Sequence, residues 1–265
     1  MDTEETQKAE EKNSFICVNL CPSVARRIVF QIPQRHALER ALLITCLATA
    51  AMAGEPNKVR YVAIGDSYSI GEGASPNESW PALLTRHLNA QGLRVELVAN
   101  PSRTGWTTQQ AIDRELPVMV NAGPNFATLQ IGVNDWVQGV STEDFRKRFV
   151  LLVDRMLEVL GNKNRLLIVT IPDFGVTPTG APYARGRDIS AGIAAFNQII
   201  TEEAKKRGLR TVDVFDLSNR MHDDSSLRAS DGLHPSAKEY AEWEKVIFPV
   251  TLELIKNERS IETNH

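Results

Sequence analysis

Cysteine is absent from most of this chain. The 265-residue sequence has three cysteines, Cys17, Cys21 and Cys46, and all of them precede residue 50. The remainder therefore has no thiol nucleophile, no thiolate metal ligand and no disulfide framework. Cys17 and Cys21 are spaced like half of a metal site, but no second half follows. We expect no bound metal.

A strong charge of either sign is also lacking. Lys and Arg number 30 against 33 Asp and Glu, which gives a net charge of −3. Without a basic footprint, the sequence predicts no nucleic-acid binding. It has no zinc spacing, no EF-hand and no P-loop, so we expect no cofactor.

Long hydrophobic runs are missing as well. The uncharged residues 41–54 are fewer than the roughly 20 that a membrane-spanning helix needs. They follow several arginines and end in Ala51-Met52-Ala53, which is typical of a secretory signal. This pattern predicts a secreted or periplasmic protein, and a translation start assigned too early would explain the residues ahead of the run. The alternative is an amphipathic helix or disordered tail on a cytoplasmic protein.

The rest of the chain has no repeat and no low-complexity linker. Residues 1–14 are polar and acidic, as in disordered segments. We therefore predict a disordered or signal-like segment at 1–54, one domain at 55–258 and a short tail at 259–265.

Strand-like and helix-like patterns alternate within this domain. Strands are expected at 59–64, 94–100, 126–132, 165–171 and 211–216. Helices are expected at 79–92, at 107–116, after Ser141, around 189–204 and from Pro235, with Pro249 kinking or ending the last. Such alternation predicts an α/β fold with a parallel sheet covered on both faces, and five strands favour the order 2-1-3-4-5. Ligands then bind beyond the carboxyl ends of the first and third strands.

Polar motifs follow these strands at the same expected edge. They are Gly65-Asp66-Ser67, the loop at 99–108, Gly132–Asp135 and the segment Asp231–Ser236. A serine becomes nucleophilic when a base takes its proton. His234, with an ordinary pKa near ~6.5, suits that role. Asp231, three residues earlier, is placed to hold the imidazole. The rival base, His222, lies in a polar loop that is typical of solvated surface.

Attack on an ester carbonyl also needs hydrogen-bond donors for the resulting oxyanion. The candidates are the backbone N–H groups of Ser67 and Gly105 and the side-chain amide of Asn134. Asp66 and Asp135 are expected to play structural roles in their loops.

Together, these motifs resemble the four blocks of the SGNH (GDSL-type) esterase/lipase superfamily. The resemblance covers about residues 58–250 and departs from the family motif at Tyr68-Ser69, where a leucine is usual. It implies a flavodoxin-like three-layer α/β/α sandwich with Ser67, His234 and Asp231 as the catalytic triad. It also implies an oxyanion hole formed by Ser67, Gly105 and Asn134.

The substrate pocket is less defined by the sequence. Trp106 and Trp136 each follow a motif, so they either line the pocket or pack the loops. The long loop 172–187 is predicted to form a pocket wall through Tyr183 and Arg185.

The prediction is a serine hydrolase that cleaves small-molecule carboxylic esters, with acetyl or other short acyl groups favoured by analogy with the fold. The alternatives are a lysophospholipase or thioesterase of the same family, and a non-catalytic flavodoxin-like binding module.

Overall fold

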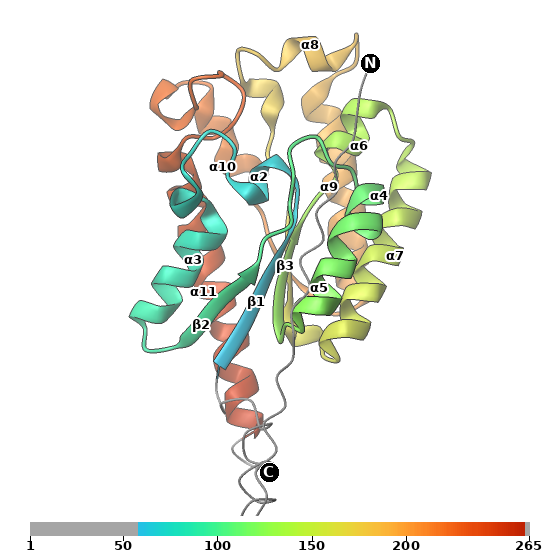
Figure 1. Ribbon diagram of the computed structural model, residues 1–265. Coiled ribbons are helices and arrows are strands. Elements are labelled where there is room, and N and C mark those ends of the chain that lie inside the picture. Colours follow the sequence, from blue (N-terminus) through green and yellow to red (C-terminus); the bar gives the residue numbers. More distant parts are fainter. Residues whose placement is uncertain (1–57, 263–265) are drawn as a thin grey trace, which may run out of the picture. The chain divides into compact units, whose positions relative to one another are not determined.

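The computed structural model describes residues 58–262 (Figure 1). The signal-like segment 1–54 and residues 263–265 lie outside the described residues, so the expectation of export stays a prediction.

A five-stranded, wholly parallel sheet forms the centre of the described domain. Its order is β2-β1-β3-β4-β5, as the sequence predicted. The strands are β1 (Lys58–Gly65), β2 (Arg94–Ala99), β3 (Phe126–Gln130), β4 (Leu166–Val169) and β5 (Arg210–Val212).

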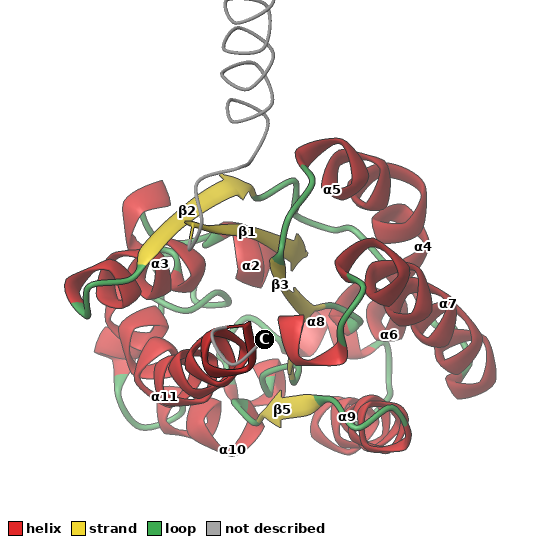
Figure 2. Ribbon diagram, turned by 90° about the horizontal axis from the view of Figure 1, so that it is seen from below, coloured by secondary structure: helices red, strands yellow, loops and turns green. Residues whose placement is uncertain are grey.

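Helices cover both faces of this sheet, which gives three layers (Figures 1 and 2). One face carries α3 (Trp80–Ala90) and α11 (Ala237–Glu262). The other carries α5 (Leu116–Ala122), α7 (Thr142–Leu160) and α9 (Ile189–Lys206). Shorter helices lie in the connections: α2 (Ser67–Ile70), α4 (Thr108–Gln110), α6 (Val133–Gln138), α8 (Ala181–Ala184), α10 (Phe215–Ser218) and the π-helical turn η2 (Ala111–Glu115).

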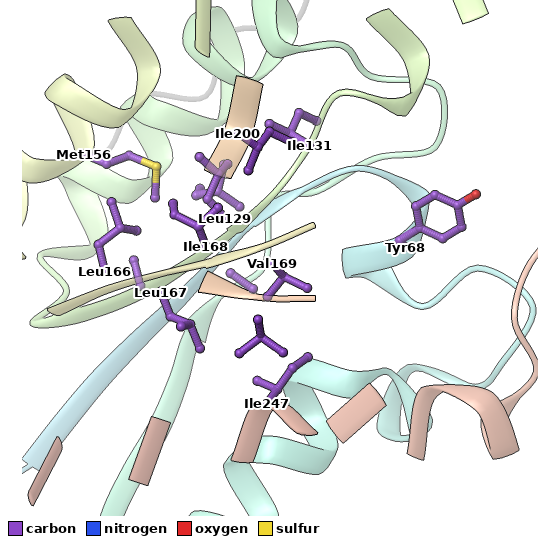
Figure 3. Packing of buried hydrophobic residues seen from close by; sticks show 14 of the residues in the cluster. Tyr68, Leu129, Ile131, Met156, Leu166, Leu167, Ile168, Val169, Ile200 and Ile247 are labelled. Carbon is purple, nitrogen blue, oxygen red and sulfur yellow. The ribbon is translucent and has the colours of Figure 1, made fainter. Parts of the chain in front are cut away.

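The core lies between the sheet and these two helix layers. All residues of β3 and β4 are buried, as expected for strands covered on both faces. Figure 3 shows part of this cluster, with Met156 of α7 beside Leu166 of β4, and Tyr68 at the far end beyond the strands.

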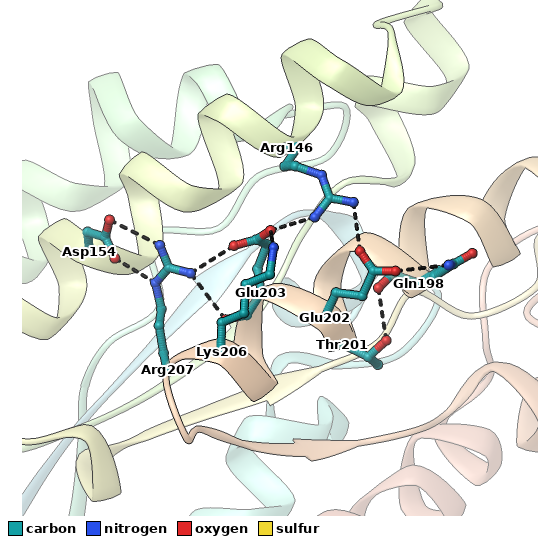
Figure 4. A network of polar contacts seen from close by, with 8 residues as sticks. All are labelled: Arg146, Asp154, Gln198, Thr201, Glu202, Glu203, Lys206 and Arg207. Atoms are coloured by element: carbon teal, nitrogen blue, oxygen red, sulfur yellow. Dashed lines mark hydrogen bonds and ion pairs between the residues drawn. The ribbon is translucent and has the colours of Figure 1, made fainter.

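An ion-pair network joins α7 to α9 (Figure 4). Glu203 of α9, which is 6% exposed, accepts hydrogen bonds from Arg146, Arg207 and Lys206. Burial raises the pKa of Glu203, but these three cations outweigh it and lower the pKa to about 2. The network joins the outer surfaces of these two helices.

Two expected elements end differently from the prediction. The expected strand at 211–216 stops at Val212, because the Asp213 carboxylate accepts a hydrogen bond from the Phe215 N–H (2.8 Å) and starts a turn into α10. The last helix begins at Ala237, since Pro235 pairs with Arg228 in an isolated bridge. It continues through Pro249, which does not end it.

The helix expected at 107–116 is also longer than predicted. It passes through the π-helical turn η2 and continues as α5, with Pro117 in the first turn of α5. The π-helical turn before it interrupts the regular i→i−4 hydrogen bonding, so a residue without an N–H is tolerated there.

Candidate active site

The serine at the end of β1 is held in a tight turn. Asp66 caps α2 by accepting a hydrogen bond from the Tyr68 N–H (3.1 Å), and Ser67 is the first residue of that helix. Gly65 has no room for a side chain, since a Cβ would lie 2.1 Å from the Ser69 hydroxyl and 2.4 Å from the Gln130 carbonyl oxygen. The lack of space therefore requires glycine at the first position of Gly-Asp-Ser, and the cap of α2 uses the aspartate at the second.

Asp231 and His234 form a hydrogen-bonded pair across one turn. Oδ2 of Asp231 lies 2.6 Å from Nδ1 of His234. Oδ1 accepts the backbone N–H groups of Leu233 (2.8 Å) and His234 (3.0 Å). Gly232 takes the positive φ of 70° that this turn needs. Partial burial raises the pKa of Asp231, but the bonds from His234 and the two N–H groups outweigh it, so the pKa lies below its usual value.

These segments meet at a small cavity of about 40 Å³. Three polar residues line it, namely Ser67, Asn134 and His234. The remaining lining residues are largely apolar: Tyr68, Val133, Val137, Phe174, Tyr183 and Leu233. A hydroxyl, an amide and an imidazole from three distant motifs thus border one space, with the Asp231 carboxylate bonded to the imidazole.

The loop that carries Gly105 is tied to α6 by two side chains. The Asn134 amide donates a hydrogen bond to the Trp106 carbonyl oxygen (2.9 Å). The Asp135 carboxylate accepts bonds from the N–H (2.7 Å) and hydroxyl (3.0 Å) of Thr108. Gly105 itself is exposed, has a φ of 82° and is not a lining residue of the cavity.

Of the residues proposed for the pocket, Tyr183 lines the cavity and is 41% exposed. Trp106 and Arg185 do not line it. Trp136 is buried; its ring centroid lies 5.9 Å from that of Phe174 and 3.9 Å from the Arg187 guanidinium carbon. Trp136 therefore supports a cavity wall from behind.

Sequence reasoning did not single out most of the apolar lining. Tyr68, Val133 and Leu233 each stand directly beside a polar motif residue. That adjacency was the available signal. Val137 carries no comparable signal, whereas Phe174 lies in the loop 172–187 that was predicted to form a pocket wall.

The other described histidines lie elsewhere. His222 is exposed and pairs with the Asp223 carboxylate (2.7 Å). His87 stacks on Phe248, with ring centroids 3.6 Å apart, and contacts Glu244. Neither lines the cavity.

Three carboxyl groups, those of Asp66, Glu115 and Asp135, are buried in or near the turn that carries Ser67. Burial raises the pKa of Asp66 to about 8, that of Glu115 to about 8 and that of Asp135 above its usual range. Among residues 58–262, no group of three or more His, Cys, Asp and Glu side chains is arranged to hold a metal ion. Within that same range, no helix combines the length and hydrophobicity of a membrane span.

The described domain is thus a parallel α/β sandwich with a serine, a histidine–aspartate pair and an amide at the carboxyl edge of its sheet. The chain belongs to the GDSL-like Lipase/Acylhydrolase family, whose sequence model matches residues 63–241. The resemblance stated from the motifs is thereby confirmed.

Individual relatives agree with this assignment. An arylesterase from Vibrio mimicus is 30% identical over 117 residues, which cover 43% of this chain and 56% of the relative. The match therefore spans little more than half of that protein.

Solved structures share the fold at lower identity. A lipase/acylhydrolase from Enterococcus faecalis has a TM-score of 0.60 and 20% identity, covering 74% of this chain and 96% of the other. The esterase EstA from Pseudoalteromonas sp. has a TM-score of 0.58 and 18% identity, covering 75% of this chain and all (100%) of the other.

Proposed function

We propose that this protein hydrolyses short-chain carboxylic esters through an acyl-enzyme, with Ser67 as nucleophile, His234 as base and Asp231 as the partner of His234. The observation that carries the proposal is the 2.6 Å contact between Asp231 and Nδ1 of His234, beside a cavity that Ser67 also lines. A carboxylate on Nδ1 keeps the proton there and leaves Nε2 free to accept one.

The reaction follows in balanced steps. Oγ of Ser67 attacks the ester carbonyl carbon while its proton passes to Nε2 of His234. The tetrahedral oxyanion accepts hydrogen bonds from the N–H groups of Ser67 and Gly105 and from the Asn134 amide. The C–O bond to the alcohol breaks as His234 returns the proton to the leaving oxygen. Water, deprotonated by the same imidazole, then attacks the acyl carbon and releases the acid.

The Asn134 amide has two N–H donors, and only one is used by the Trp106 carbonyl oxygen. The second supports its role as an oxyanion donor. Trp106 follows Gly105 in the chain, so the same bond restrains the loop that carries the Gly105 N–H. These contacts support an oxyanion hole formed from three separate loops.

The size of the cavity favours small acyl groups. Its volume of about 40 Å³ is that of a small cavity, which is also open to solvent. Apolar side chains of Val137, Phe174 and Tyr183 border this space. An acetyl group suits it better than a long acyl chain does.

The test is a series of p-nitrophenyl esters from acetate to decanoate, assayed with wild type, Ser67→Ala and Ser69→Ala. Wild type should turn over acetate fastest, and Ser67→Ala should lose at least ~1,000-fold in kcat. Ser69→Ala removes a neighbouring buried hydroxyl and should retain activity. A fluorophosphonate probe followed by peptide mass spectrometry should label Ser67 alone.

Unchanged turnover in Ser67→Ala would contradict the proposal. Faster turnover of decanoyl or thioester substrates would move the assignment to the lysophospholipase or thioesterase alternative. An inactive, yellow purified protein would favour a flavin-binding module.

A further inference from the structure

Strand β1, which leads into Ser67, extends beyond its neighbour β2. β2 ends at Ala99, which pairs with Val62, whereas β1 continues to Gly65. On the β2 side, the final residues of β1 therefore have no strand carbonyl to bond. A buried backbone N–H without a partner is costly.

The Glu115 side chain supplies the missing partner. Its Oε2 accepts a hydrogen bond from the Gly65 N–H at 2.9 Å. Glu115 is 0% exposed, and burying a carboxyl group costs free energy that packing alone does not recover. It ends the π-helical turn η2, a rare conformation that often occurs at functional sites.

We propose that Glu115 is a positioning residue for the nucleophile, because its carboxyl oxygen holds the Gly65 N–H and thereby fixes the turn that directs Ser67 into the cavity. This role rests on the proposed function of Ser67. A second side chain from the same stretch of chain holds the far end of the turn, since Asn100 donates its amide N–H to the Ser69 carbonyl oxygen (2.8 Å). Glu115 and Asn100 thus hold the backbone before and after Ser67.

The surroundings of Glu115 keep its carboxyl group neutral near pH 7. Asp66 is the acidic group that faces it, and Asp135 acts on Asp66 in turn. Arg148 lies 3.7 Å from Asp135 and acts on that carboxyl group. Burial, with a smaller contribution from Asp66, raises the pKa of Glu115 to about 8. A neutral carboxyl still accepts the Gly65 N–H, so glutamine should replace it.

The test compares Glu115→Gln, Glu115→Leu and Glu115→Asp. Glutamine keeps the acceptor at the same reach, leucine removes it, and aspartate withdraws it by one methylene. Met156→Ala is the control for lost core packing, because Met156 is fully buried and lies at the opposite end of the cluster from Tyr68 (Figure 3). We expect Glu115→Leu and Glu115→Asp to lower kcat and the rate of fluorophosphonate labelling at least ~10-fold, since small misplacements of a nucleophile are costly.

KM should change little, because the cavity-lining residues are retained. Glu115→Gln and Met156→Ala should stay within about threefold of wild type, by the same argument from positioning. Amide exchange of Gly65, followed by NMR, should be at least ~10-fold faster in Glu115→Leu than in wild type. If leucine prevents folding, Glu115→Asp serves for all of these measurements.

Labelling of Ser67 at the wild-type rate in folded Glu115→Leu or Glu115→Asp would overturn this role alone. Loss of activity in Glu115→Gln equal to that in Glu115→Leu would overturn it too, because the acceptor is retained there. No labelling of Ser67 in wild type would overturn the proposed function and this role with it.

Discussion

Asp231 uses its two carboxyl oxygens for different partners. Oδ1 accepts two backbone N–H groups, and Oδ2 contacts Nδ1 of His234. An asparagine at this position would keep its single oxygen on the two N–H groups. Its NH₂ group would then face Nδ1, which would have to act as an acceptor, so that Nε2 would carry the imidazole proton.

This reasoning predicts the result of Asp231→Asn. An imidazole protonated on Nε2 cannot take the Ser67 proton, so kcat should fall by about 10²- to 10⁴-fold at neutral pH. The matched control is Asp223→Asn, which makes the same change beside exposed His222. Rates measured across pH 5–9 should leave the control unchanged. A larger loss in Asp223→Asn would instead assign the base to His222.

The roles that sequence reasoning assigned at this scale followed from chemistry. Ser67, Asn134 and His234 could be proposed from the sequence because few residue types serve as nucleophile, amide donor and base, and the structure brings all three to one cavity. Glu115 was not identifiable, because a glutamate at 115 in a polar helix pattern is typical of solvated surface. Its burial depends on the π-helical turn, which leaves no clear pattern in the sequence.

At the scale of elements, the segment between β4 and α9 forms one wall of the cavity. Arg187 ties this segment to the end of α6 by donating hydrogen bonds to the carbonyl oxygens of Trp136 (2.6 Å) and Val137 (3.1 Å). Its guanidinium also stacks over the Trp136 ring. Tyr183 of α8 lies on this segment, so the position of that ring depends on Arg187.

Arg187→Ala should therefore loosen the wall. We expect the ratio of kcat/KM for butyrate over acetate to rise at least ~3-fold, and the free energy of unfolding to fall by ~1 kcal/mol from the lost cation–π contact. Arg185→Ala is the matched control, because Arg185 is exposed and does not line the cavity. An equal change in selectivity in Arg185→Ala would contradict this view of the wall.

Strands and long helices were predictable at this scale because their patterns extend over many residues. Ser141 caps α7 as expected, accepting a bond from the Asp144 N–H (3.1 Å). The ends of β5 and α11 were predicted a few residues wrongly, because Asp213 turns the chain through the Phe215 N–H and Pro235 is held in a bridge to Arg228. Asp213 also accepts a bond from the Thr170 hydroxyl (2.8 Å).

Over the whole molecule, buried carboxyl groups make stability depend on pH. The pKa values of Asp66 and Glu115 are about 8 in the folded protein, against about 4 in an unfolded chain. The unfolded state therefore loses these protons first as pH rises. The associated stabilisation is complete below about pH 4 and is lost progressively up to about pH 8.

We therefore expect the melting temperature to fall as the pH rises from 5 to 9, because the stabilisation from Asp66 and Glu115 is lost over this range. Between pH 5 and pH 9, the melting temperature of Glu115→Gln should fall less than that of wild type. The variant should therefore gain stability relative to wild type as the pH rises. Calorimetry at the two pH values measures this difference. Parallel curves for both proteins would show that Glu115 titrates normally.

The π-helical turn η2 also sets the spacing between Thr108 and Glu115, two residues that bond to other parts of the fold. Upstream of it, Thr108 is bonded to Asp135; at its end, Glu115 is bonded to Gly65. A π-helical turn takes up one residue more than an α-helical turn, so this turn fits an extra residue between the two anchors while the flanking helices stay nearly aligned. The two bonds attach one stretch of chain both to α6 and to the strand that leads into Ser67, so a change in η2 would alter the proposed oxyanion loop and the serine turn together.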